Sequence, residues 1–227
     1  MQHCFETREQ ASLAAAERIT SALARRLDAQ NAASLIVSGG STPGRCFEAL
    51  AGADLDWGRV HVLLSDERWV PPSDDASNEK LVRNTLLQDK AADATLWPLY
   101  APGADIAEHC VELGNTIRTL PIPFACCLLG MGEDGHFASL FPDADNLAQG
   151  LDYEGPDLCL PVTTAASPHP RVSLTLTALS RSDEIVLLVF GEKKREVYEA
   201  AKSSGNTYPV AHLIKQKRAP VSVFWAP

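Results

Sequence analysis

The feature that most constrains the fold of this chain is an alternation between short apolar runs and longer amphipathic segments. Each apolar run is bounded by glycine, proline or polar residues, which suits a strand buried on both faces of a parallel sheet. The segments between the runs have helical periodicity, as in residues 9–29, where apolar side chains recur near one face. Strands that alternate with helices through short turns predict the α/β class, with a doubly wound, mostly parallel sheet.

The predicted elements extend through nearly the whole chain. Strands or extended pieces are expected at residues 35–37, 60–64, 97–99, 124–129, 158–162, 171–176, 184–190 and 220–225, and helices at 9–29, 45–50, 77–87, 105–120, 191–202 and 208–214. No linker, repeat or low-complexity tract divides this series. We therefore predict one three-layer domain over residues 1–227, with a small subdomain around residues 140–170 as the alternative.

A glycine-rich turn follows the strand predicted at residues 124–129. Asp134 and His136 stand among three glycines that fall within six positions. In open α/β sheets, ligands bind at the carboxyl ends of the strands. A turn at that place with an acid and an imidazole is therefore where we expect chemistry, although a single histidine in a turn can also serve only as a cap or a packing group.

The same turn matches the spacing Gly-x-Gly-x-x-Gly of dinucleotide-binding proteins over residues 130–135. That motif requires a long helix and then a second strand ending in an acid about twenty residues further on. Here Pro142 limits any following helix to less than two turns, and no apolar strand comes before Glu154. We reject a dinucleotide site for this reason.

A second glycine-rich turn, at residues 38–43, follows the strand predicted at 35–37. Gly39, Gly40, Ser41 and Thr42 precede a proline and a predicted helix. Backbone N–H groups at a helix start favour an anion, so this turn is a candidate phosphate cradle. A tight turn with a Ser/Thr helix cap explains the same residues equally well.

The distribution of charge limits the kinds of ligand. The formal net charge of −9 argues against a nucleic-acid surface, which would show a basic face. An anionic substrate would need locally concentrated cations, because the overall field repels it. Four basic residues do fall at or just beyond predicted strand ends, on the edge that carries the two turns, and they indicate a site for a phosphorylated small molecule: Arg68, Arg171, Lys193 and Lys194.

The cysteines and the apolar stretches mainly exclude certain kinds of site and classes of protein. The six cysteines are scattered and two are adjacent inside a predicted strand, which favours reduced structural thiols. No cysteine or histidine cluster has metal-ligand spacing, so we expect no metal and no other cofactor. The N-terminus lacks the pattern of a secretory signal, and no apolar run is long enough for a membrane span. We expect a cytoplasmic protein.

Several segments occur in the order found in 6-phosphogluconolactonases, so that the chain resembles this family from about residue 10 to its end. The most specific is Gly-Met-Gly-Glu-Asp-Gly-His-Phe-Ala-Ser-Leu-Phe-Pro at 130–142; the others are Ser-Gly-Gly-Ser-Thr-Pro at 38–43, Ser-Asp-Glu-Arg at 65–68, Arg-Val-Ser-Leu-Thr at 171–175 and Gly-Glu-Lys-Lys at 191–194. The resemblance implies a Rossmann-like fold shared with glucosamine-6-phosphate isomerases and deaminases. It also implies hydrolysis of 6-phospho-D-glucono-1,5-lactone to 6-phosphogluconate in the oxidative pentose phosphate pathway.

Two other functions remain as alternatives. The deaminase relatives are similar at Asp134 and His136 but carry Asn-Glu-Pro where this chain has Leu140, Phe141 and Pro142. Phe141 cannot ionise, which argues against an amino-sugar-phosphate isomerase or deaminase. A non-catalytic phosphosugar sensor would normally be fused to a DNA-binding helix-turn-helix, for which the residues before the first helix leave no room.

Lactone hydrolysis suggests a role for each candidate residue. A neutral imidazole at His136 can accept a proton from water, and Asp134 can hold its tautomer, unless Asp134 only forms an Asx turn. Arg68, Arg171 and Lys194 are expected to share phosphate binding and oxyanion stabilisation. Five further residues complete the predicted substrate site: Gly39, Gly40, Ser41, Thr42 and Asp66. The expected partner is a phosphosugar lactone, without nucleic acid or membrane, and the protein is expected to be a monomer or a weak homodimer.

Overall fold

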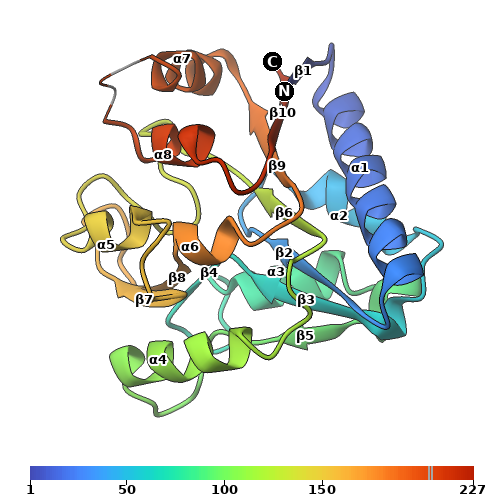
Figure 1. The fold of residues 1–227 in the computed structure, drawn as a ribbon, viewed down its shortest axis with the longest axis horizontal. Helices are drawn as coiled ribbons and strands as arrows, with labels where there is room; N and C mark the ends of the chain where they lie inside the picture. Colours follow the sequence, from blue (N-terminus) through green and yellow to red (C-terminus); the bar gives the residue numbers. More distant parts are fainter. Residues whose placement is uncertain (204, 206) are drawn as a thin grey trace.

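The fold of the computed structural model centres on one seven-stranded sheet. The structure describes residues 1–227 except 204 and 206. All strand pairs in this sheet are parallel, as the alternation of strands and helices predicted (Figure 1). The strands, in spatial order, are β1 (Gln2–Cys4), β10 (Val221–Ala226), β9 (Ile185–Phe190), β6 (Cys126–Leu129), β2 (Ala33–Val37), β3 (Val60–Leu64) and β5 (Thr95–Trp97).

Helices cover both faces of this sheet, as predicted for a doubly wound fold. α1 (Arg8–Ala29) packs along β2, β9 and β10 and against α2 (Gly44–Ala51), and α2 contacts α3 (Asn78–Thr85). α7 (Glu192–Ala201) and α8 (Pro209–Lys215) pack together on the other face (Figure 1). The strands between these layers are buried on both faces, and β2 and β6 have no exposed residue.

A second, three-stranded sheet was not predicted as a separate unit. It is antiparallel, in the order β4 (Asp66–Arg68), β8 (Arg171–Leu174) and β7 (Cys159–Val162). The apolar runs at 158–162 and 171–176 were expected as strands, and their sequences do not indicate which sheet they join. Pro161 fits this arrangement because β7 is an edge strand, where a missing N–H costs no ladder bond.

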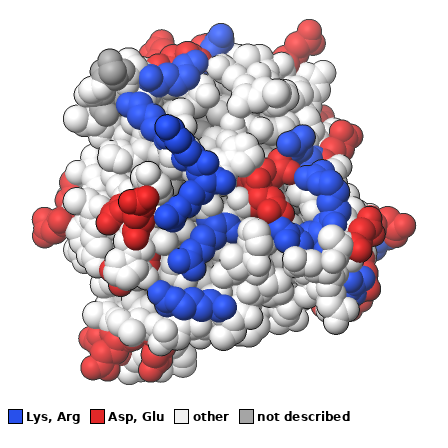
Figure 2. Space-filling model, in the orientation of Figure 1, with Lys and Arg blue, Asp and Glu red and all other residues white. Residues whose placement is uncertain are grey.

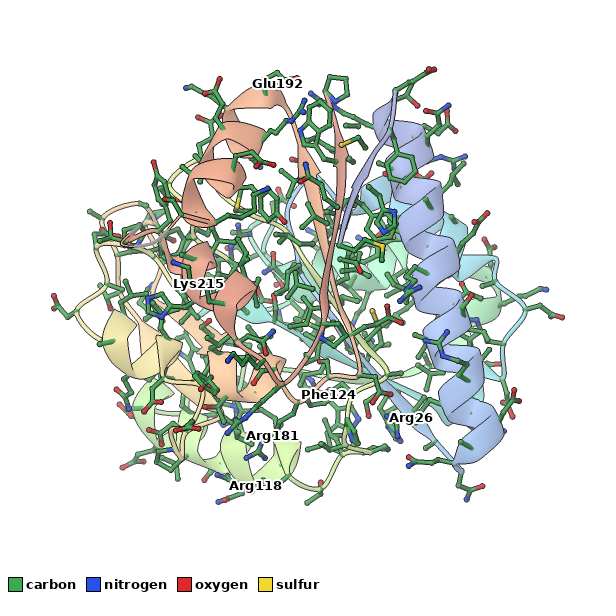
Figure 3. All side chains as sticks on the ribbon, turned by 45° about the horizontal axis from the view of Figure 1, so that its top comes forward. Arg26, Arg118, Phe124, Arg181, Glu192 and Lys215 are labelled. Carbon is green, nitrogen blue, oxygen red and sulfur yellow. The ribbon has the colours of Figure 1, made fainter. Side chains whose placement is uncertain are left out.

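The remaining differences concern short elements and element ends. β1 and the helices α5 (Leu147–Leu151) and α6 (Leu176–Leu179) were not predicted. The helix expected at 105–120 is α4 (Ile106–Ile117), whose N-cap Asp105 accepts backbone N–H bonds. The buried run from 124 enters the sheet only at Cys126. Phe124 is fully buried and forms an isolated bridge with Ser182 at the amino end of the strand (Figure 3).

The strand order defines a topological switch point in the main sheet. From β2 the chain proceeds outward to β3 and β5, then returns to β6 on the other side of β2 and continues to β9 and β10. β2 and β6 are hydrogen-bonded neighbours whose following connections leave in opposite directions. A crevice opens outside the carboxyl ends of such strands. The two glycine-rich turns, at 38–43 and 130–136, begin at these two ends.

Among the described residues, no helix combines the length and apolar character needed to cross a membrane.

Candidate active site

A cavity of about 220 Å³ lies at the switch point. Both glycine-rich turns, the strand β4 and the starts of α3, β8 and α7 contribute to its wall. Its lining residues are Ser38, Gly39, Gly40, Ser41, Thr42, Asp66, Arg68, Asn78, Gly130, Met131, Gly132, His136, Ala138, Arg171 and Lys194. All the predicted substrate-binding residues and His136 therefore share one cavity, while Asp134 lies directly behind His136.

The side chain of His136 is held in one orientation by its own loop. Its Nδ1 lies 2.6 Å from Oδ1 of Asp134, and the same carboxylate oxygen accepts the backbone N–H of His136 at 3.1 Å. Because an ionised carboxylate only accepts, Nδ1 carries the donated proton and the lone pair of the neutral ring is on Nε2. The backbone contact also shows that Asp134 makes the Asx interaction, so this carboxylate serves both the turn and the imidazole.

Gly132 makes the close approach of this pair to the turn possible. A β-carbon at position 132 would lie 2.2 Å from Nδ1 of His136 and 2.5 Å from Oδ1 of Asp134. Both atoms belong to the hydrogen bond that fixes the ring. Any larger residue at this position would therefore push the imidazole away from its carboxylate.

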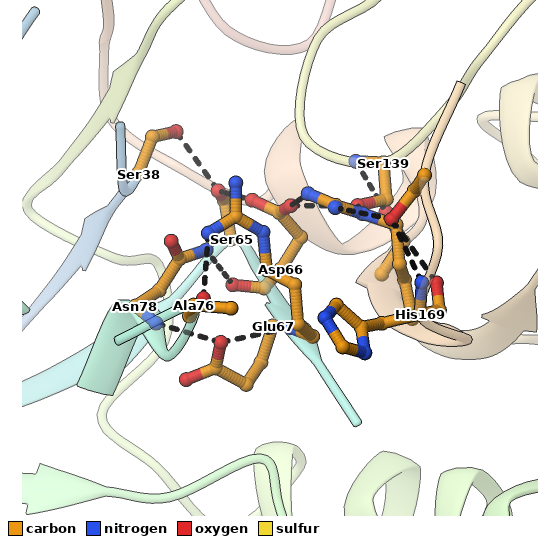
Figure 4. A network of polar contacts seen from close by, with 12 residues as sticks. Ser38, Ser65, Asp66, Glu67, Ala76, Asn78, Ser139 and His169 are labelled. Atoms are coloured by element: carbon orange, nitrogen blue, oxygen red, sulfur yellow. Dashed lines mark hydrogen bonds and ion pairs between the residues drawn. The ribbon is translucent and has the colours of Figure 1, made fainter. Parts of the chain in front are cut away.

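The opposite wall contains a buried ion pair that connects several loops (Figure 4). Asp66 accepts Nη2 of Arg171 at 3.0 Å, and both side chains are less than a tenth exposed. The hydroxyl of Ser139 lies between them, since it donates to Asp66 at 2.6 Å and accepts Nε of Arg171 at 2.5 Å. Ser65 donates to the other oxygen of Asp66 and is itself 2.8 Å from the hydroxyl of Ser38.

This network gives Asp66 a structural role that the sequence did not indicate. Burial alone would raise the pKa of Asp66, but the charge of Arg171 and the hydrogen bonds from Ser139 and Ser65 outweigh it and lower the pKa. Both carboxylate oxygens are already occupied by protein donors. Asp66 lines the cavity, yet its contacts make it a support for Arg171 more than a ligand for substrate.

Arg68 has more donors free for a ligand than Arg171. It donates one N–H to the carbonyl of Ala76 at 2.6 Å, and its buried Nε has no partner in the described part of the protein. Burial, reinforced by the charge of Arg171, lowers the pKa of Arg68. The strand β4, which ends at Arg68, is fixed by Glu67, whose buried carboxylate accepts the hydroxyl of Ser77 and two N–H groups at the start of α3.

The two adjacent lysines of α7 have different environments. Lys194 lines the cavity, is half-buried and makes no hydrogen bond or ion pair with the described residues; burial lowers its pKa. Lys193 is well exposed and pairs with Glu133 at 3.1 Å outside the cavity. The expectation that both lysines belong to the site is therefore wrong for Lys193. Figure 2 shows a broader band of Lys and Arg that extends from α7 past α8 toward α4.

In the turn at residues 38–43, the hydroxyl of Ser38 contacts Ser65, while those of Ser41 and Thr42 make no hydrogen bond with the described residues. The N-cap of α2 is Pro43, with no side-chain cap bond, so the alternative of a Ser/Thr cap is excluded. Ser41 and Thr42 line the cavity instead. Gly39 lets Asn78 approach, because a β-carbon there would lie 1.9 Å from its Oδ1. Asn78 also donates to the carbonyl of Asp66 at 2.9 Å.

Four functional neighbours were missed from the sequence: Ser38, Ser65, Asn78 and Ser139. Isolated serines and asparagines carry no pattern that separates them from surface residues. For Ser38, Ser65 and Ser139 the only available signal was their place inside the recognised segments at 38–43, 65–68 and 130–142.

The fold and the site together define an α/β protein with a cation-lined pocket at the switch point of a parallel sheet. The chain belongs to the family of glucosamine-6-phosphate isomerases and 6-phosphogluconolactonases, which it matches over residues 6–225. It is 40% identical to a 6-phosphogluconolactonase of Mesorhizobium japonicum, covering 99% of this chain and 94% of that protein. It is 39% identical to a 6-phosphogluconolactonase of Pseudomonas aeruginosa, covering 96% of this chain and 91% of that protein.

Solved structures agree with this assignment. A crystal structure of a 6-phosphogluconolactonase from Shewanella baltica superposes with a TM-score of 0.95 at 36% identity, covering 100% of this chain and 97% of that one. A monomeric glucosamine-6-phosphate deaminase superposes with a TM-score of 0.77 at 17% identity. This last likeness shows the shared fold alone.

We expect Gly132→Ala to release the imidazole of His136 from Asp134, because the added methyl group would lie 2.2 Å from Nδ1, closer than the two atoms can approach. In the wild type, ¹⁵N NMR of the neutral ring should show the proton on Nδ1, and in the variant it should move to Nε2. Gly58→Ala is the control, since a β-carbon there meets only ordinary contacts at 3.7 Å. An unchanged tautomer in a folded Gly132→Ala protein would contradict this account of the turn.

A second prediction concerns pH and the buried ion pair. The pKa of Asp66 is lower in the folded protein than the value of about 3.9 in an unfolded chain. The pair is therefore fully stabilising above about pH 3.9, and this stabilisation is lost as the pH falls through the folded-state pKa. Asp66→Asn should lower the free energy of unfolding by about 3–5 kcal/mol at neutral pH, because Arg171 loses its partner.

The loss in free energy of unfolding caused by Asp66→Asn should become smaller when urea unfolding is repeated below about pH 3.9. Asp54→Asn is the matched control, because Asp54 also forms an ion pair, with Lys90, but is fully exposed. We expect little change in stability from this variant. A deficit that stays constant with pH would show that Asp66 does not act through its charge.

Proposed function

We propose that this protein hydrolyses 6-phospho-D-glucono-1,5-lactone to 6-phospho-D-gluconate, the step that 6-phosphogluconolactonases carry out in the oxidative pentose phosphate pathway. The observation that carries this proposal is the convergence of the His136–Asp134 pair with three cationic side chains on one cavity. Membership of the family and the identity of about 40% to 6-phosphogluconolactonases support it. The proposal places the enzyme in the cytoplasm, as a monomer or weak homodimer.

The imidazole supplies the base. A lactone is an activated ester, so a water molecule can attack its carbonyl carbon without a covalent enzyme intermediate. Nε2 of His136 takes a proton from this water as the new C–O bond forms. The positive charge that develops on the ring is stabilised by Asp134 through the 2.6 Å contact at Nδ1.

The attack gives a tetrahedral oxyanion, which then collapses with cleavage of the bond to the ring oxygen. The proton held by His136 passes to this leaving oxygen, which becomes the hydroxyl of the open-chain product, and the acid ionises in water. Donors fixed before the reaction stabilise the oxyanion best, because they need no reorganisation. The rigidly held Arg171 and the half-buried Arg68 are both fixed in this sense.

The cations of the cavity also suit the phosphate group. Arg68, Arg171 and Lys194 share the two tasks of binding phosphate and stabilising the oxyanion, and the free hydroxyls of Ser41 and Thr42 lie in the same wall. Backbone N–H groups at the start of α2 add a favourable dipole. These residues form the proposed substrate site with Gly39 and Gly40, and Asp66 supports it from behind.

A coupled assay tests the function directly. Glucose-6-phosphate dehydrogenase generates the lactone, and the formation of 6-phosphogluconate is followed with and without this protein. His136→Ala should lower kcat by about 10²- to 10⁴-fold after subtraction of spontaneous hydrolysis, with phosphosugar binding retained. Wild-type protein that fails to accelerate lactone hydrolysis would refute the proposal, and release of ammonia from glucosamine 6-phosphate would favour the deaminase instead.

Lys194→Met tests the anion site while keeping most of the apolar stem. Because Lys194 is half-buried and its ammonium has no described partner, its charge is available to a bound anion. We expect KM to rise about 10- to 100-fold with a smaller change in kcat, as for loss of uniform binding. Lys193→Met is the matched control and should leave both constants unchanged, since Lys193 lies outside the cavity. Equal effects of the two variants would mean that only overall charge matters.

A further inference from the structure

The ring of Phe141 contacts both the imidazole of His136 and the guanidinium of Arg171. The centroids of the Phe141 and His136 rings are 4.1 Å apart, with an interplanar angle of 31°. Cζ of Arg171 lies 5.4 Å from the centroid of the same phenyl ring. The proposed base and a permanent cation of the site therefore share one aromatic neighbour, and neither contact is needed for the hydrogen bonds already described.

Packing holds Phe141 in this place. Its side chain is only 5% exposed, and it belongs to a small apolar cluster with Ala144, Leu160 and Val162, separate from the main core. Leu160 and Val162 belong to β7, the edge strand of the small sheet. The sheet that contains Arg171 thus also provides the support against which the phenyl ring packs.

We propose that Phe141 is a positioning residue for His136 that also stabilises the imidazolium formed during hydrolysis. The face of an aromatic ring attracts a cation much more strongly than a neutral group. The imidazole is neutral before it takes the proton from water and cationic afterwards. The contact is therefore stronger after proton transfer than before, which is the kind of interaction that raises kcat.

The charges around the imidazole show why such help matters. The hydrogen-bonded partner on its own loop, Asp134, favours the protonated ring. Arg171 on β8, Arg68 at the end of β4 and Lys194 on α7 line the same cavity, and the carboxylate of Asp66 is paired with Arg171. Cations gathered for an anionic substrate thus disfavour a second cation among them. An aromatic face at 4.1 Å offsets part of this repulsion without adding a carboxylate that would repel phosphate.

The inference rests on the proposed function but can fail separately from it. Phe141→Leu removes the aromatic face and keeps an apolar side chain of similar bulk. We expect kcat for the lactone to fall about 3- to 30-fold with KM changed less than about twofold. Phe141→Tyr keeps the aromatic face and should retain most of the wild-type kcat. Phe124→Leu is the matched control, because Phe124 is also buried but lies at the amino end of β6, away from the cavity.

NMR provides a measurement that would not change if Phe141 had only a structural role. The titration of the imidazole is followed in free wild-type and variant proteins, with the signal assigned by its loss in His136→Asn. In Phe141→Leu the midpoint should shift to lower pH by about half a unit or more, because the cationic form loses its aromatic neighbour. In Phe124→Leu the midpoint should not move, even where thermal stability falls.

Three results would overturn the inference. The first is an unchanged midpoint in Phe141→Leu, and the second is a fall in kcat that Phe124→Leu reproduces at equal loss of stability. The third is a rise in KM alone, which would make Phe141 part of the substrate site. Should Phe141→Leu fail to fold, Phe141→Met gives the same comparison. A shifted midpoint in a protein without lactonase activity would instead refute the function and leave the effect of Phe141 on His136 standing.

Discussion

The ion pair between Asp66 and Arg171 is the interaction on which the geometry of the site depends. It joins the end of β3 and the short strand β4 to β8, and the hydroxyl of Ser139 extends it to the loop that carries His136. A buried pair of this kind gives little net stability, but its loss is costly because one charge is left unpaired. The ion pair instead fixes the relative positions of segments that are far apart in the chain, since these segments meet in one register only when all partners are present.

Topology explains why these segments meet at all. β2 and β6 lie side by side, and the connections after them leave in opposite directions, so the two glycine-rich turns face each other across a crevice. The small antiparallel sheet supplies what the parallel sheet cannot. Its strand β8 presents Arg171, and its edge strand β7 packs against Phe141. One sheet thus forms the crevice, and the other positions the cation and the aromatic ring beside the base.

The predictable part of the fold and site is the part encoded locally. Apolar runs with short turns identified the parallel sheet, and the glycines around Asp134 and His136 identified the turn that brings His136 to the cavity. The runs around 160 and 172 predicted strands, but their partners depend on contacts between distant residues. Lys193 and Lys194 are adjacent and chemically identical, so only their phase on α7 decides which of them faces the cavity. The role of Ser139 depends on Asp66 and Arg171, which are 73 and 32 residues away.

The electrostatics of the site follow from burying cations in an acidic protein. With a net charge of −9, the molecule repels an anionic substrate at long range, so attraction must come from a few nearby groups. Burial lowers the pKa of both Arg68 and Lys194, which means that these cations are partly desolvated by the protein. In the proposed function, a bound phosphate group offsets part of this desolvation cost, because opposite charges interact strongly where water is excluded. The imidazole of His136 lies in the same cavity, between a carboxylate at Nδ1 from Asp134 and the aromatic ring of Phe141. In the proposed function this cavity must accept an anionic ligand and also an imidazole that becomes cationic, and residues 134–141 provide the groups that meet the second requirement.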